Sequence, residues 1–275
     1  MKTAIASSCF RMFPVEWTFR AIAEAGYDGL ELYGGRPIAY PDDLDNDTIR
    51  NIINLQHTYH LEIPLFCPDL SSYPFRVAWR TTEEKEATYH YLEQCLEAAC
   101  RLDIPAIRIL CGHAGYRSDQ AESWKRIEEI LEPLCRMAEK EGKSILIQPQ
   151  AVMDSNTVMY TADAMDIISE INSPSLGILI DTMVPFLNRE SLEHSLYVAR
   201  DRLSYIHLAD CNGTDNSTVL LGNGMLNLPE LIREIIGTGY GGWVGISLPH
   251  RYLAEPLMGA VTEKNALETI LKQAS

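Results

Sequence analysis

The sequence has few basic residues, no long apolar run and no paired-cysteine motif. Lysine and arginine total 23 against 38 aspartates and glutamates, which gives a formal net charge of -15 over 275 residues. A field of this sign repels the phosphates of nucleic acids and of anionic lipids. No stretch approaches the ~20 apolar residues that span a bilayer, and the first apolar run is too short for a signal peptide. We therefore expect neither a nucleic-acid partner nor a membrane partner.

The cysteines also argue against an extracellular protein. There are seven, an odd number, and none forms a C-x-x-C pair or another metal-ligand spacing. Reduced thiols in a cytoplasmic protein explain this pattern better than a disulfide framework does. Hydrophobic residues make up 46% of the chain and no Gly/Ser-rich linker interrupts it, so we expect one globular domain over residues 1–275.

Eight short apolar runs, rich in β-branched residues, recur along the chain. Such runs are typical of strands that are buried on both faces of a parallel sheet. We predict strands within residues 2–8, 29–34, 62–68, 106–112, 144–150, 176–182, 203–210 and 242–248.

Helical patterns separate these runs and carry their own start signals. Thr81, Asp119 and Asn227 are each followed three residues later by glutamate, which resembles a capping box. Eight strand–helix units in a chain of this length favour an α/β fold, a single (β/α)8 TIM barrel. A doubly wound sheet is the competing fold, but no glycine-rich phosphate loop follows the first strand.

Polar residues at the ends of the predicted strands are the functional candidates, because barrel enzymes place their chemistry there. These residues are Ser8, Glu31, Tyr33, His113, Gln148, Gln150, Asp181, His207, Asp210 and Ser247. Asp181 and His207 end consecutive strands and are predicted to converge on one metal ion.

Several segments carry a family resemblance over essentially the whole chain. They are GYDGLELYGGRP at 26–37, GHAGY at 112–116, DSN at 154–156, HLAD at 207–210, LGNG at 221–224 and GYGGW at 239–243. With these segments the sequence resembles the sugar isomerase/epimerase group of xylose-isomerase-like barrels. In that family Glu, Asp, His and Glu from strands five to eight hold one divalent ion, commonly manganese. The two glutamates also move protons on opposite faces of a ketose carbon, through a metal-stabilised enediolate.

The resemblance places the family's ligand set on Gln148, Asp181, His207 and Ser247. Asp181 and His207 match the family, whereas neutral Gln148 and Ser247 replace the two glutamates. Metal affinity should fall, because hard divalent ions depend on anionic oxygens. Neither replacement is a competent proton carrier without an activating neighbour.

The resemblance also implies a sugar-binding pocket. Its expected substrate contacts are Glu31, Tyr33, Asp210 and Asp154, the last at the position of a family glutamate. If the acid/base groups have moved, the candidates to carry them are His113, Asp154, Asp210 and His250.

Two functional hypotheses follow, together with a third that ranks lower. The first is an isomerase or epimerase for a ketose or ketose amine, and the alternative is a sugar-binding homologue without activity. Abasic-site endonucleases share this barrel but use many histidines, and only three lie near the predicted rim here: His113, His207 and His250. A phosphorylated substrate would need partners such as Arg36, Arg117 or Arg251. We also expect that the protein associates into a homo-oligomer.

Overall fold

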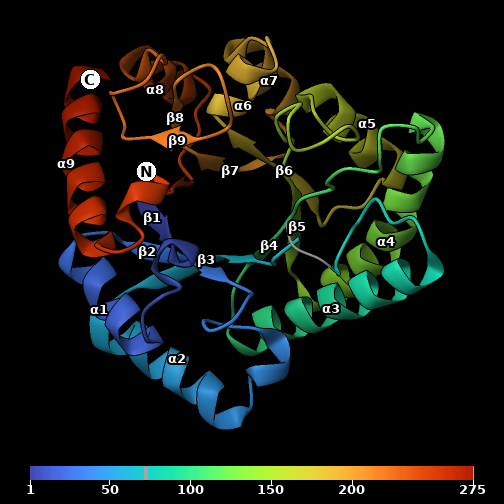
Figure 1. Cartoon of the computed structure of the whole chain (residues 1–275), viewed down its shortest axis with the longest axis horizontal. Helices are drawn as coiled ribbons and strands as arrows, with labels where there is room; N and C mark the ends of the chain where they lie inside the picture. Colours follow the sequence, from blue (N-terminus) through green and yellow to red (C-terminus); the bar gives the residue numbers. More distant parts are fainter. Residues whose placement is uncertain (71–73, 275) are drawn as a thin grey trace.

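The computed structural model describes residues 1–70 and 74–274, and its centre is a closed barrel of parallel strands (Figure 1). Around the barrel the order is β1, β2, β3, β4, β5, β6, β7, β10 and back to β1. The strands are β1 (Lys2–Ala6), β2 (Gly29–Tyr33), β3 (Glu62–Cys67), β4 (Ala106–Ile109), β5 (Ser144–Ile147), β6 (Leu176–Asp181), β7 (Leu203–His207) and β10 (Trp243–Ile246).

Helices form a ring outside the barrel (Figure 1). They are α1 (Val15–Glu24), α2 (Asn46–Tyr59), α3 (Thr82–Arg101), α4 (Gln120–Glu141), α5 (Thr161–Ile171), α6 (Met183–Leu187), α7 (Leu192–Ala199), α8 (Leu228–Gly237) and α9 (Pro256–Ala274). The structure also has three short 3-10 helices. The first, η1 (Ser7–Phe10), follows β1; the second, η2 (Pro41–Asp43), precedes α2; and the third, η3 (His250–Tyr252), follows β10. A small antiparallel pair, β8 (Asp210–Cys211) and β9 (Thr218–Val219), lies in the connection after β7.

Alternation along each strand divides the side chains into two sets. Ile107 and Ile109 of β4 belong to the large core between the barrel and its helices. Ala106 of the same strand belongs to a smaller core with Leu146 and Tyr205. Because successive strand residues point to opposite faces, the smaller core fills the barrel interior. Polar side chains that point to the same interior side, nearer the carboxyl ends of the strands, then line the mouth of the barrel.

The structure confirms the predicted fold, a single TIM barrel with eight parallel strands. The hydroxyl of Thr81 and the carboxylate of Asp119 each accept the backbone N–H three residues on, as the capping boxes predicted. The prediction for Asn227 was wrong, because its side-chain amide instead donates to the Glu230 carboxylate. Within residues 1–70 and 74–274, no helix is both long enough and apolar enough to cross a bilayer.

Candidate active site

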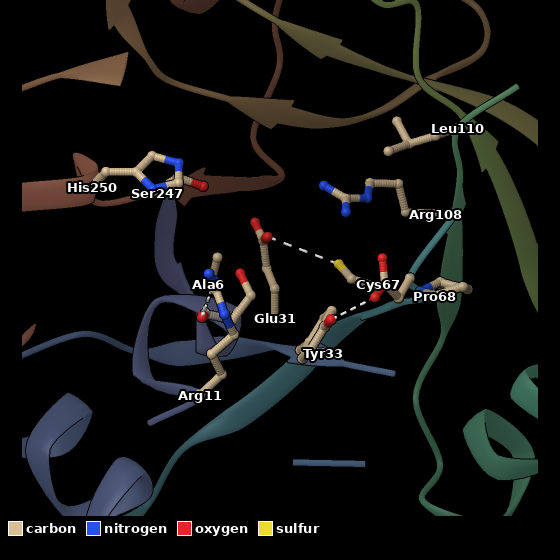
Figure 2. Close-up of a pocket in the computed structure, with 12 residues that line it drawn as sticks. Ala6, Arg11, Glu31, Tyr33, Cys67, Pro68, Arg108, Leu110, Ser247 and His250 are labelled. Atoms are coloured by element: carbon tan, nitrogen blue, oxygen red, sulfur yellow. Dashed lines mark hydrogen bonds between the residues drawn. The ribbon is translucent and has the colours of Figure 1, made fainter. Parts of the chain in front are cut away.

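A pocket of about 380 Å³ opens at the carboxyl-terminal mouth of the barrel (Figure 2). Its walls come from η1, from the ends of β2, β3 and β4, and from the segment after β10. The lining residues are Ala6, Ser8, Arg11, Glu31, Tyr33, Cys67, Pro68, Asp69, Arg108, Leu110, Ser247 and His250. This is the end of the barrel where such folds hold their chemistry.

A chain of three groups, two of them buried and Asp181 partly buried, underlies the pocket. Oε1 of Glu31 lies 2.9 Å from Nε2 of His207. On the other side of the same ring, Nδ1 lies 3.8 Å from Oδ2 of Asp181. The other Asp181 oxygen accepts the Met183 backbone N–H at 3.1 Å. The structure therefore brings the predicted residues Glu31, Asp181 and His207 together, with the imidazole between the two carboxylates.

The two carboxyl groups differ in their ionisation. Burial acts to raise the pKa of Glu31, but the neighbouring His207 ring and the Arg108 guanidinium lower it below its ordinary value. Burial raises the pKa of Asp181, and His207 only partly offsets this. Glu31 is thus a buried carboxylate whose charged form is favoured by the His207 ring and the Arg108 guanidinium.

Gly245 of β10 makes room for that carboxylate. A Cβ atom at Gly245 would lie 1.8 Å from Oε1 of Glu31 and 2.8 Å from the His207 ring. These distances are far below van der Waals contact, so a larger residue would push Glu31 away from His207. The pair is positioned by β2, β7 and β10 together.

Tyr33 and Asp69 form the polar wall next to Glu31. The Tyr33 hydroxyl donates to Oδ2 of Asp69 at 2.7 Å. Burial, and then the hydrogen bond to Asp69, raise the pKa of Tyr33 well above its ordinary range, so the phenol remains protonated. This wall offers oxygen atoms to the hydroxyl groups of a ligand.

Arg108 projects into the pocket from the middle of β4 (Figure 2). Its Nη1 donates to Oε1 of Gln148 at 3.5 Å, a long hydrogen bond. Its Nε is buried and has no hydrogen-bond partner within the described residues. Gln148 itself is buried.

The structure places three other predicted residues outside the pocket lining formed by the described residues. Nδ1 of His113 accepts the Gly115 backbone N–H at 2.9 Å. Asp154 is exposed and accepts a hydrogen bond from the Asn216 amide. Asp210 accepts four backbone N–H groups, a role that holds a loop in place; their donors are Cys211, Gly222, Gly224 and Leu226.

Sequence reasoning missed Arg11 and Arg108 and named other arginines. Arg36 pairs with Asp43 on the surface, and none of the arginines proposed for a phosphate lines the described pocket. A signal for Arg108 exists in the sequence, because it is the one charged residue in the strand Ala-Ile-Arg-Ile. A charge at a position that alternates into a barrel needs a partner or a ligand.

The donor set fits a divalent ion poorly. The four positions that the resemblance assigns to the metal supply one carboxylate, Asp181, one imidazole, His207, and the neutral side chains of Gln148 and Ser247. Among the described residues no group of three His, Cys, Asp or Glu side chains is arranged to hold a metal ion. Hard divalent ions favour several anionic oxygens, which this set does not offer.

The family model for xylose isomerase-like TIM barrels matches residues 19–270. The chain belongs to this family. Fructoselysine 3-epimerase of Escherichia coli O157:H7 is 30% identical over 98% of this chain and 96% of that protein. The expected relationship to sugar isomerases and epimerases is therefore confirmed.

Several solved structures have the same fold. The 3-keto-D-glucoside 4-epimerase of E. coli superposes with a TM-score of 0.80 and 19% identity, covering 99% of each chain. D-psicose 3-epimerase of Clostridium cellulolyticum H10, solved with D-tagatose, gives a TM-score of 0.83 and 14% identity over the whole of both chains. The IolI protein, solved with a zinc atom, gives 0.85 and 16% identity, over 100% of this chain and 99% of that one.

Proposed function

We infer that this protein is a sugar epimerase or isomerase that moves a proton at the carbon next to a ketose carbonyl. The observation that carries this proposal is a charged Glu31 carboxylate in the same pocket as the His250 imidazole. The relationship to fructoselysine 3-epimerase supports the same chemistry. A ketose or a ketose amine is the proposed substrate class.

The positions of Glu31 and His250 suit two proton carriers. Glu31 enters the pocket from β2, and His250 enters from η3 on another wall (Figure 2). A carbon held between them loses a proton to one group and receives one from the other. Delivery to the opposite face inverts the carbon, which is epimerisation.

His250 is the proposed carrier among the four relocated candidates because it lines the pocket. His113 has one ring nitrogen occupied by the Gly115 N–H. Ser247 adjoins the pocket beside His250 and is proposed to bind a substrate hydroxyl. Gln148 is proposed to orient Arg108, through the bond described above.

Tyr33 and Asp69 are the proposed contacts for the hydroxyl or amine groups of the sugar. The Glu31 carboxylate is kept charged in a buried position although its desolvation costs stability, and perturbed groups of this kind cluster at functional sites. The pocket and the curated relatives therefore favour the enzyme over the inactive alternative.

Deuterium uptake from heavy water into a ketose tests the function. Fructoselysine, D-fructose and D-tagatose are incubated with the protein, and the carbon-bound proton is followed by NMR. We expect uptake at a carbon next to the carbonyl, with inversion at that carbon for an epimerase. Absence of uptake from every ketose, together with binding of one of them, would instead support the non-catalytic hypothesis.

His250→Gln and His113→Gln form a matched pair for the proton carrier. We expect His250→Gln to lower the exchange rate by about 10²-fold, because a positioned acid/base group contributes on that scale. His113→Gln should stay within a few-fold of the parent. The reverse result would transfer the role to His113.

A further inference from the structure

We propose that the Arg108 guanidinium stabilises the oxyanion of the reacting sugar, in the role that a divalent ion has in the resembled family. This inference rests on the proposed proton-transfer function. It assigns the stabilisation of the oxyanion to a residue of β4. Neither the predicted metal ligands nor the proposed proton carriers supply this stabilisation.

The first support is the position of Arg108. Ala106, two residues earlier on the same strand, packs in the barrel interior, while Ile107 and Ile109 pack outward against the helices. Arg108 therefore shares the inward face with Ala106, one step nearer the mouth. Figure 2 shows its guanidinium entering the pocket opposite His250, with the Glu31 carboxylate between them.

The second support is that Arg108 has donors to spare. Its one hydrogen bond to the described residues is long, 3.5 Å from Nη1 to the Gln148 amide oxygen. Its Nε–H is buried and has no hydrogen-bond partner within the described part of the chain. A buried, charged donor without a partner is costly unless a ligand completes it. An oxygen anion is the ligand that a guanidinium binds best.

The third support is the balance of charge. Two carboxyl groups, the buried Glu31 and the partly buried Asp181, interact with the cationic Arg108, and His207 lies between them. The two residues that replace the family glutamates, Gln148 and Ser247, are neutral. Relative to the family, the site has lost two negative charges and contains a fixed positive charge on Arg108. Both differences make the site less attractive to a cation. A divalent ion here would meet too few anionic ligands and the repulsion of Arg108.

The reaction step needs no further reagent. A base removes the proton from the carbon next to the carbonyl, and the electron pair of that C–H bond forms the C=C bond of an enediolate. The carbonyl π electrons move onto oxygen, and the guanidinium N–H groups stabilise the resulting negative charge. Return of a proton to the carbon reverses these shifts. A preorganised donor of this kind acts where charge develops, which is its main value in catalysis.

A manganese titration tests the inference without any assay of activity. We expect the melting temperature of the wild-type protein to be unchanged by 1 mM Mn²⁺. The double variant Gln148→Glu/Ser247→Glu restores the two carboxylates of the family. Adding Arg108→Met to this double variant should tighten Mn²⁺ binding by at least tenfold relative to the double variant alone. Equal affinity with and without Arg108 would overturn the charge argument. If Mn²⁺ raises the melting temperature of the wild-type protein, and Asp181→Ala or His207→Ala abolishes this increase, the proposal itself would be overturned.

Deuterium exchange in the presence of a chelator tests the catalytic role. We expect the wild-type protein to keep its rate in EDTA, and Arg108→Met to lose about 10²- to 10³-fold. Arg108→Lys should retain part of the rate, because it keeps the charge but not the fork of donors. Arg136→Met is the matched control, since Arg136 pairs with Glu132 on the exposed face of α4.

The outcomes separate the two proposals. A wild-type rate that EDTA removes and Mn²⁺ restores, or an Arg108→Met rate within threefold of wild type, would overturn the role of Arg108 and leave the epimerase function standing. If no ketose exchanges its proton, the proposed function fails. The manganese titration then still decides whether the site is built around Arg108 or around a metal.

Discussion

Glu31 and Glu263 are both glutamates with almost no solvent exposure, 2% and 0%, yet their pKa values are shifted in opposite directions. Glu31 lies in β2 beside His207 and Arg108, and these groups lower its pKa although burial acts to raise it. Glu263 lies in α9, where burial raises its pKa to about 7. One of its oxygens accepts the Leu221 backbone N–H, and the other has no partner in the described part of the chain.

This difference shows that burial alone does not decide the charge of a carboxyl group. At Glu263, burial and then the nearby Asp210 outweigh the Leu221 N–H donor and Arg251, so the neutral form is favoured up to about pH 7. Glu31 meets an imidazole and a guanidinium, so its charged form is favoured. The surroundings of Glu31 at the barrel mouth therefore favour its charged form, whereas burial in the helical layer dominates at Glu263.

Replacing Gly245 should change the surroundings of Glu31 more than any of the other proposed substitutions. Gly245→Ala places a methyl group where the Glu31 carboxylate lies, so the pair with His207 must separate. We expect a loss of about 1–3 kcal/mol in the free energy of unfolding, the usual cost of overpacking, together with a lower exchange rate. Urea unfolding measures the first effect.

Gly237→Ala is the matched control for Gly245→Ala. It lies at the end of α8, where an added Cβ atom has no neighbour within 4 Å. The free energy of unfolding should rise there by about 0.4–1 kcal/mol, because alanine restricts the unfolded chain. If both variants behaved alike, the close approach of Gly245 to Glu31 would not matter.

The titration of Glu263 should appear in the pH dependence of the free energy of unfolding. Its pKa in the folded state, about 7, lies above its ordinary value of 4.5, so folding favours the protonated form. The stabilising contribution is complete below pH 4.5 and is lost as the pH rises to about 7 and beyond. The full change is on the order of 3 kcal/mol.

Glu263→Gln isolates this contribution from that of the other acids. Comparing urea midpoints at pH 5 and pH 8, we expect the wild-type protein to lose more stability than the variant between the two values. An identical loss in both proteins would show that Glu263 does not titrate in this range. No change in proton exchange is expected, since Glu263 lies outside the pocket lining formed by the described residues.

The fold could be predicted from the sequence because parallel strands buried on both faces appear as continuous apolar runs. The run Ser-Ile-Leu-Ile of β5 is an example, and its outward and inward residues pack in different cores. The candidate site was predicted in part. Polar residues at strand ends revealed Glu31, Asp181 and His207, which the structure brings together.

The rest of the site depends on packing between distant segments. Arg108 was missed because it lies inside its strand rather than at the end, although alternation alone predicts that it faces inward. The room that Gly245 leaves for Glu31 joins residues more than 200 positions apart. The burial of Glu263 beside Leu221 likewise depends on how α9 packs, which no local pattern reveals.

A carbon-13 NMR titration of the glutamate carboxyl groups tests the central claim most directly. Spectra of Glu31→Gln and Glu263→Gln assign the two signals by their disappearance. We predict that Glu31 keeps the chemical shift of a charged carboxylate from pH 5 to pH 8, while Glu263 titrates near pH 7. A Glu31 signal that is protonated at pH 7 would contradict the account, because the barrel mouth would then lack the charged carboxylate on which the proposed chemistry depends.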